Sequence, residues 1–440
     1  MRLRGGAVVA LVDRSFASKV NMQRERITAL TRKQISDRAS ARFVYLVDAI
    51  ARAHEPTQAQ LDGLESSYRS TGEFVVASPE FQQLLAEVHG HGSRQLGTLI
   101  RPTDETREGF DVDLIARLQR SAMRLYDGDG GPTRLLNDLH SVLERYAKRH
   151  DLRIQRWERC VTLEYAGGMC ADITPVIDEP LLASAFGDTH GRVPDCKLKL
   201  YDWTNPRGYI KFFNTAAAIS PVFSGALRFS EALKALDSAE VAPLPSPQEV
   251  FDRLLCKLIQ LLKLHRNVAF GGSQAGPDAS PTSVFLTTLT AKAYAVQAPL
   301  PHDSPLDLLL DIVETLPDHF DRIEQVDGTE LWYLQNPSAP HDNLAAGMNS
   351  DHRQAGFGWW HARVIQHLSD ILDAIESRAG MDTMLAAVKA AFGERAARAI
   401  QTEQSQGRAT QRHLGRVTLI PVAGVPMSAV ARQHNFFGEP

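Results

Sequence analysis

The chain has 440 residues, of which 43% are hydrophobic and 23% are charged. This composition is typical of a folded protein, and the length predicts roughly two or three domains. Such a chain can bury a core large enough to be stable without disulfides or bound metals. Lys and Arg number 48 against 52 Asp and Glu, which gives a net charge of −4. This near balance of charges argues against a protein whose main function is nonspecific binding of long nucleic acids.

Cysteine usage and hydrophobicity indicate the compartment. The four cysteines form no Cys-x-x-Cys pair, so the sequence predicts neither a zinc ribbon nor a redox motif. No apolar run reaches the roughly 18 residues that a membrane-spanning helix needs. We therefore expect a cytoplasmic protein with no membrane partner and no strong nucleic-acid binding.

The first elements in chain order are predicted to be helical. Residues 1–21 contain only a short apolar stretch and are interpreted as a disordered leader, or as sequence upstream of a start at Met22. Helical spacing of apolar residues continues from there to about residue 91, and includes a helix predicted from Ser78 to Val88.

The middle of the chain changes character. Residues 111–118 alternate with a period of two, as do residues 159–166 and 169–177, whereas residues 131–150 have helical spacing. This order predicts a small α+β domain with a mixed sheet. Asp178 and Glu179, which follow the last of these strands, are expected to be turn residues.

From about residue 220 onward the pattern is again mostly helical, with apolar stripes in 251–266, 304–316 and 358–380. The last residues have no clear period and contain prolines, which favours an extended tail. The predicted divisions are a leader at 1–21, a core with N-terminal helices at 22–219, a helical lobe at 220–415 and a C-terminal tail at 416–440.

Three aspartates carry the strongest chemical signal. Asp111 and Asp113 are two positions apart in a predicted strand, so their carboxylates should project from one face of the sheet. Alone, such a pair is typical of a strand end that faces water. Asp172, however, lies inside an apolar strand, where a carboxylate without a partner is costly. Three converging carboxylates would hold hard cations such as Mg²⁺.

A glycine-rich segment precedes the aspartates. Gly92-Ser93 is followed four residues later by Gly97-Thr98. Glycine lets a backbone approach phosphate closely, and the Ser93 hydroxyl can donate to a phosphate oxygen. Either pair alone is weak evidence, but their order before the three aspartates points to nucleotide chemistry.

These motifs resemble a known family. GSRQLGTLIRP, FDVDL and MCADITPVI look like the active-site signature of the polymerase-β-like nucleotidyltransferases. More narrowly, they resemble the bacterial cyclic GMP–AMP synthase/DncV-like nucleotidyltransferases (CD-NTases) of CBASS antiphage systems. Further similar segments bring the resemblance to about residues 57–375, namely DWTNPRGYIKFFN, LLKLHRNVAF, PTSVFLTTLTAKAY and LQNPSAPHDNLA. One departure is His91, where the family pattern has Gln, and the absence of a Cys/His cluster does not support a zinc thumb.

The resemblance implies a polymerase-β-like core with a mixed sheet, a C-terminal helical lobe and a central cleft between the two. It implies that Asp111 and Asp113 hold two Mg²⁺ ions, for which Mn²⁺ could substitute, and that Asp172 binds one of them and helps to deprotonate the attacking hydroxyl.

The same resemblance implies a nucleotide site. Gly92 and Ser93 would contact phosphates, and a basic pair formed by Lys263 and Arg266 would face the triphosphate, together with Ser283. Sequence reasoning leaves two alternatives open, because the basic pair could be a solvated helix end and Ser283 could be an N-cap or turn residue.

The implied activity is Mg²⁺-dependent synthesis of a cyclic di- or trinucleotide messenger from ATP- or GTP-type nucleotides, through a linear intermediate. Two alternatives remain: transfer of AMP to RNA or protein, and a non-catalytic nucleotide-binding module. Implied partners are nucleoside triphosphates, an effector protein that the product activates, and an accessory regulator that acts on the tail. This chain ends in Phe-Gly-Glu-Pro, so we favour a tail docked through Phe436 and Phe437 over a conjugated one.

Overall fold

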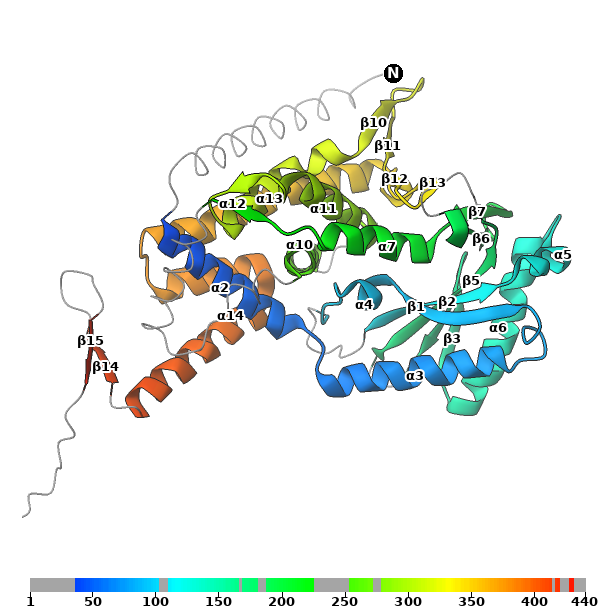
Figure 1. Ribbon diagram of the computed structural model, residues 1–440, viewed down its shortest axis with the longest axis horizontal. Helices are drawn as coiled ribbons and strands as arrows, with labels where there is room; N and C mark the ends of the chain where they lie inside the picture. Colours follow the sequence, from blue (N-terminus) through cyan, green and yellow to red (C-terminus); the bar gives the residue numbers. More distant parts are fainter. Residues whose placement is uncertain are drawn as a thin grey trace, which may run out of the picture.

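The computed structural model describes residues 36–102, 110–165, 168–180, 187–224, 253–271, 278–413, 416–419 and 427–430. The predicted leader lies outside these residues. A sheet-containing amino lobe packs beside a larger helical lobe, and the two have separate hydrophobic cores (Figure 1). The predicted α+β class with a mixed sheet and C-terminal helices is confirmed.

The amino lobe is built on a seven-stranded mixed sheet. β2 and β5 are parallel neighbours at its centre, β1 pairs with β2 antiparallel, and β4 and β6 both pair with β5 antiparallel. The strands are β1 (Leu85–His91), β2 (Asp111–Leu118), β3 (Arg153–Arg156), β4 (Val161–Glu164), β5 (Cys170–Asp178), β6 (Gly191–Asp195) and β7 (Leu200–Thr204). The accompanying helices are α3 (Gln58–Val76), α4 (Gly92–Leu96), α5 (Met123–Tyr126) and α6 (Gly131–His150).

Alternation along β2 separates the two faces of this sheet. Leu114 and Leu118 are fully buried in the core that α3 and α6 cover (Figure 1). The alternate positions point to the opposite face, which carries Asp111 and Asp113 at one end and Arg117 at the other. The face with the leucines therefore stabilises the lobe, and the face with the aspartates can contribute side chains to a functional site.

The helix predicted from Ser78 to Val88 is wrong, because Leu85–His91 form strand β1. Phe81, Leu84, Leu85 and Val88 fit helical spacing, but Leu85 and Val88 pair with β2. Backbone pairing along six register positions outweighs an ambiguous local pattern here. Gly92 consequently follows a strand and not a helix.

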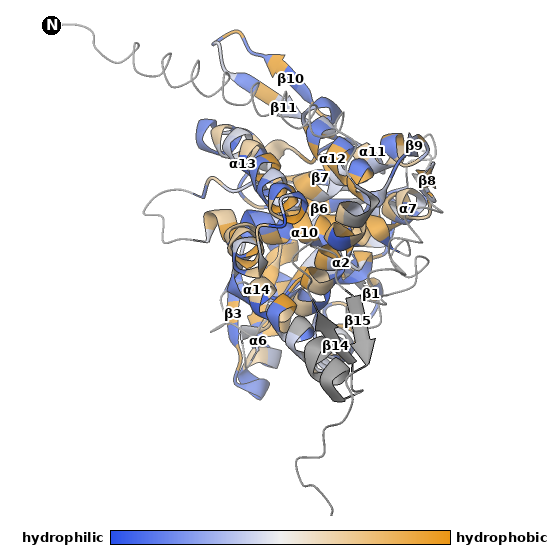
Figure 2. Ribbon diagram, turned by 90° about the vertical axis from the view of Figure 1, so that its left-hand side faces the viewer, coloured by the Kyte–Doolittle hydropathy of each residue, from blue (hydrophilic) through white to orange (hydrophobic). Residues whose placement is uncertain are grey.

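The helical lobe surrounds α10, whose largely hydrophobic ribbon lies near its centre (Figure 2). Its helices are α2 (Asp37–His54), α7 (Pro206–Ala217), α10 (Leu254–Phe270), α11 (Ser283–Gln297), α12 (Pro305–Thr315), α13 (Asp351–Glu376) and α14 (Met381–His413). Short strands decorate it: β8 (Val222–Phe223), β9 (Pro301–His302), β10 (Asp321–Glu324), β11 (Glu330–Tyr333), β12 (Gln335–Asn336) and β13 (Ala339–Asn343).

Two helices that precede the predicted domain boundary at residue 219 pack in the helical lobe and not in the amino lobe. Phe43, Leu46 and Ile50 of α2 are buried in the core of the helical lobe, as is Phe213 of α7. Both helices were expected in the amino lobe because they precede the boundary in the chain. Their apolar stripes find matching surfaces on α10, α11 and α14, so the helical lobe begins with α2 and is completed after the sheet.

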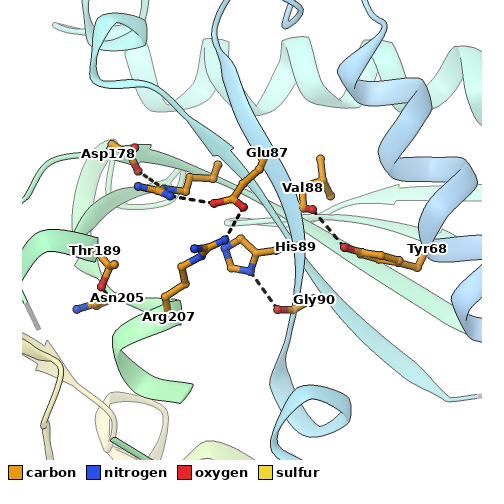
Figure 3. Close-up of polar contacts among 10 residues, drawn as sticks. Tyr68, Glu87, Val88, His89, Gly90, Asp178, Thr189, Asn205 and Arg207 are labelled. Atoms are coloured by element: carbon orange, nitrogen blue, oxygen red, sulfur yellow. Dashed lines mark hydrogen bonds and ion pairs between the residues drawn. The ribbon is translucent and has the colours of Figure 1, made fainter. Parts of the chain in front are cut away.

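A cluster of charged residues connects α7 to the sheet face that carries the aspartates, at the end of β2 away from them (Figure 3). Arg117 of β2 donates to Glu87 at 2.8 Å and to Asp178 at 2.6 Å, and Arg207 of α7 also bonds Glu87. Asp178 is thus the last residue of β5, in an ion pair, and not the turn residue that we expected. The cluster fixes the start of α7 against the sheet.

Little of the C-terminal tail is described. β14 (Arg416–Leu419) and β15 (Met427–Val430) form an antiparallel pair beyond α14. The predicted docking of Phe436 and Phe437 lies outside the described residues. In the part of the chain that the structure covers, no helix combines the length and apolarity needed to span a membrane.

Candidate active site

The three aspartates lie together on one face of the sheet. Asp113 of β2 stands directly opposite Asp172 in the parallel register with β5. Asp111 precedes Asp113 by two residues, so its side chain leaves β2 on the same face. The structure therefore gathers the three carboxylates at the starts of two adjacent central strands.

These carboxylates are close enough to influence one another. Burial, together with the neighbouring Asp172 and Asp111, raises the pKa of Asp113 to about 6, and Lys263 opposes this change. A carboxylate that resists ionisation beside two others marks a place where negative charge accumulates. A cation among them would relieve that repulsion.

Gly92 lies against this cluster at the turn from β1 to α4. Its φ is +63°, in the left-handed region, and a Cβ built at this position would overlap the carboxylate of Asp113. Only glycine satisfies both demands at once. The chain thus brings the Gly92-Ser93 backbone directly beside the carboxylates, as the order of motifs in the sequence suggested.

A cleft of about 920 Å³ opens above the carboxylates. Gly92, Ser93 and the three aspartates line it from the amino lobe, and Lys263, Arg266 and Ser283 line it from the helical lobe. All eight residues singled out from the sequence therefore border one cavity. Its size suits ligands as large as nucleotides.

Lys263 is buried and not part of a solvated helix end, since its exposed fraction is 5%. Its Nζ donates to the hydroxyl of Thr98 at 3.2 Å, in the second of the two small-residue pairs. Burial and the nearby Arg266 lower the pKa of Lys263 to about 8, whereas Asp113 raises it. An anionic ligand between Lys263 and the aspartates would stabilise its charged form.

Arg266 and Ser283 are neighbours on the helical side of the cleft. Arg266 donates from Nη1 to the Ser283 hydroxyl and to the carbonyl of Pro281, both at 2.9 Å. Burial lowers the pKa of Arg266 to about 10. Ser283 is the first residue of α11 and follows the N-cap residue Thr282, so it is not itself the N-cap. Positive charge thus faces negative charge across the cleft.

Comparison with known proteins identifies the domain that contains the site. Residues 47–216, which contain β1, β2, β5 and the glycine-rich turn, match the Second Messenger Oligonucleotide or Dinucleotide Synthetase domain. The matched domain is that of the CD-NTases. The comparisons accordingly identify a nucleotidyltransferase of the second-messenger synthases.

Relatives of known function support the same assignment. A c-di-GMP synthase from Roseivirga ehrenbergii is 24% identical over 315 residues, which are 71% of this chain and 74% of the relative. The cyclic dinucleotide synthase CdnG from Bradyrhizobium diazoefficiens is 29% identical over 179 residues, 38% of this chain and 39% of CdnG.

Solved structures show the fold. The structure of the Bradyrhizobium diazoefficiens CdnG in complex with GTP superposes with a TM-score of 0.56 at 20% identity, covering 82% of this chain and 97% of CdnG. The complex of Escherichia coli MS115-1 CdnC with HORMA-deltaN gives a TM-score of 0.50 at 14% identity, over 79% and 97% of the two chains.

One polar pair beside the carboxylates was not predicted from the sequence. Thr162 of β4 lies opposite Asp172 and hydrogen-bonds its Oδ1, and Trp157 donates to the Thr162 hydroxyl at 2.9 Å. No sequence signal singles them out, because threonine is a common residue of strands.

Polar side chains on the β12–β13 side of the cleft were also not predicted as site residues, although their segment was among those that resemble the family. Asn336 and Asp342 border the cleft, and Asn336 donates to Asp342 Oδ2 at 2.9 Å. Asn205, the N-cap of α7, donates to the carbonyl of Ser338 at 2.8 Å. These bonds join the start of α7 to the β12–β13 turn.

The donor chemistry of the site fits a divalent metal. Within the described residues, no three His, Cys, Asp or Glu side chains already stand in a coordinating arrangement. The three aspartates nevertheless supply hard carboxylate oxygens from adjacent strands, and their mutual repulsion favours a bound cation. Asp111, Asp113 and Asp172 are therefore the residues that would hold it.

Proposed function

We propose that this CD-NTase joins two nucleoside triphosphates, at least one of them GTP, into a cyclic dinucleotide that serves as a messenger in antiphage defence. The observation that carries the proposal is the pairing of Asp113 with Asp172 on one side of the cleft that Lys263 and Arg266 line from the other lobe. The two similar synthases, which make c-di-GMP or another cyclic dinucleotide, support the choice of product.

The phosphate chain of the donor nucleotide would lie between the lobes. Gly92 lets its backbone come close, Ser93 donates its hydroxyl to a phosphate oxygen, and Lys263 and Arg266 neutralise the β- and γ-phosphates from the helical side. Ser283 then positions Arg266, to which it is hydrogen-bonded. This arrangement leaves the α-phosphate nearest to the aspartates.

The reaction forms one phosphodiester bond and releases one pyrophosphate at each of two steps. Two Mg²⁺ ions, or Mn²⁺ in their place, would supply charge neutralisation of the phosphates and a lowered pKa of the attacking hydroxyl when held by the three aspartates. Asp172 accepts the proton of the ribose hydroxyl, whose oxygen attacks the α-phosphorus in line. Positioning between the lobes and fixed charges account for most of the rate gain. The linear product then rebinds and is closed.

Mass spectrometry of the products made from all four nucleoside triphosphates tests this function. We expect a phosphatase-resistant cyclic dinucleotide that contains guanine, because a ring has no terminal phosphate to remove. A phosphatase-sensitive linear product, or label transferred to RNA or protein, would instead favour the nucleotidyl transfer alternative.

Asp342 is the residue that we expect to select guanine. Guanine presents adjacent N1–H and N2–H₂ donors, which match a carboxylate, whereas adenine presents an acceptor at N1. Burial raises the pKa of Asp342, so a partner that donates to its ionised form would stabilise it. Asn336 already holds Oδ2, which orients the group at the cleft wall.

Replacement of Asp342 by Asn should therefore lower kcat/KM for GTP by roughly tenfold or more, since a hydrogen bond to a charged group contributes about 1.5–3 kcal/mol. Turnover of ATP should change much less. Asp370→Asn is the matched control, because Asp370 also accepts from a side-chain amide, Gln366 at 2.6 Å, but does not line the cleft. An equal loss with both nucleotides would contradict the role in base selection.

A further inference from the structure

Asp172 accepts a side-chain hydrogen bond from a neighbouring strand. In the antiparallel register of β4 with β5, Thr162 stands directly across from Asp172. The Thr162 hydroxyl donates to Asp172 Oδ1, and Thr162 is buried with 8% of its surface exposed. The contact is shielded from competing water.

The direction of this hydrogen bond is fixed by a second one. The indole Nε1–H of Trp157 donates to the Thr162 oxygen at 2.9 Å. An indole can only donate, and a hydroxyl has a single proton, so the Thr162 proton points to the carboxylate. Trp157 itself is held in the turn before β4, where its backbone N–H donates to the carbonyl of Cys160 at 2.9 Å. The chain of donors therefore runs one way, from Trp157 through Thr162 to Asp172.

Asp172 is consequently flanked by different groups on its two sides. The hydroxyl of Thr162 lies on the β4 side, and the repelling carboxylate of Asp113 lies on the β2 side. An aspartate has two side-chain torsions, and repulsion alone would let it rotate among several orientations. The hydrogen bond holds Oδ1 toward β4 and so fixes the plane of the carboxylate in the absence of any ligand.

We propose that Thr162 is a positioning residue, oriented by Trp157, that presets the carboxylate of Asp172 for binding a divalent cation. The proposal rests on the metal-dependent function proposed above. Outer partners of metal-binding carboxylates commonly change metal affinity or activity by 10- to 100-fold when they are removed. A threonine suits this place because its hydroxyl donates without adding charge, whereas a lysine or arginine would compete with the cation.

Three variants of the full-length protein test this inference. Thr162→Val keeps the branched shape and removes the hydroxyl, Thr162→Ser keeps the hydroxyl, and Trp157→Phe removes only the orienting donor. Thr174→Val is the matched control, because Thr174 lies two residues after Asp172 on the same face of β5. Each protein is titrated with Mn²⁺ alone, and free Mn²⁺ is followed by electron paramagnetic resonance. Melting temperatures are measured alongside.

We expect Thr162→Val to raise the Kd for Mn²⁺ by about tenfold. Thr162→Ser should bind like the wild type, Trp157→Phe should lie between the two, and Thr174→Val should be unchanged. In turnover assays the Mg²⁺ concentration for half-maximal rate should rise in Thr162→Val, and excess Mg²⁺ should restore most of kcat. A merely structural role would lower the melting temperature without this recovery.

Two outcomes overturn different statements. If the wild type binds Mn²⁺ and Thr162→Val binds it equally well, the positioning role is wrong while the proposed function stands. If the wild type binds no Mn²⁺ and makes no product with Mg²⁺, the proposed function fails and the inference fails with it. Should Thr162→Val not fold, Trp157→Phe decides the matter, because Trp157 is 51% exposed and its loss should be tolerated.

Discussion

Replacement of both Asp111 and Asp113 by alanine should abolish nucleotide incorporation and leave the melting temperature of the metal-free protein unchanged or raised. The two side chains would hold the cations and also repel each other and Asp172, so their removal takes away function and strain together. Pyrophosphate release with Mg²⁺ and thermal unfolding with a chelator measure the two effects. Retained product formation would overturn the assignment of the metal site.

The stability effect has a defined dependence on pH. Because the pKa of Asp113 is about 6 in the folded chain and 3.8 in its ordinary state, the folded protein binds the proton more tightly than the unfolded chain. The metal-free protein therefore loses stability as the pH rises from about 4 to 6, on the order of 1–3 kcal/mol from this group. Asp113→Asn should remove that loss.

Unfolding by urea at pH 4.5 and pH 8 with a chelator measures this difference. The gain in stability of Asp113→Asn over the wild type should be larger at pH 8, and Mg²⁺ should reduce it by stabilising the wild type alone. Asp62→Asn, on the exposed surface of α3, serves as the control. The same gain at both pH values would contradict the origin in the ionised carboxylate.

The central strands could be predicted from the sequence because their hydrophobic pattern fits a strand and not a helix. The period of two along 111–118, together with an apolar strand around Asp172, is sufficient to expect the aspartates on one face. The pairing of Asp113 with Asp172 is then a matter of neighbouring strands. The glycine-rich turn was likewise recognisable, although the element before it was misread.

Features that depend on distant partners could not be predicted in this way. Leu85–His91 has a helical pattern that only pairing with β2 overrides. α2 joins the helical lobe because its apolar stripe packs on helices that begin at least 200 residues later in the chain. The contact of Thr162 with Asp172 depends on the register of β4 with β5, which the sequence pattern does not predict. The sequence around Lys263 fits a solvated helix end equally well, and only its burial beside Thr98 excludes that interpretation.

Replacement of Gly92 by alanine should nearly abolish synthesis, and valine should do the same. At a φ of +63° any L-residue is strained by about 1–2 kcal/mol, and the added Cβ would overlap the Asp113 carboxylate. Either the turn moves away from the proposed phosphate site or Asp113 rotates away from Asp172. Both movements disturb the geometry that transfer requires, so we expect the initial rate of pyrophosphate release to fall by at least about 100-fold.

Gly90→Ala provides the matched control two residues earlier in β1. A Cβ at Gly90 would meet only the end of the Gln95 side chain, at an ordinary 3.4 Å, and the backbone there is not in the left-handed region. This variant should keep its rate within a few-fold of the wild type. Wild-type activity in Gly92→Ala would show that Asp113 tolerates displacement, and would remove the reason for placing the donor phosphates beside this turn. Equal losses at both glycines would instead indicate a general defect of β1, which the melting temperatures of the two variants would reveal.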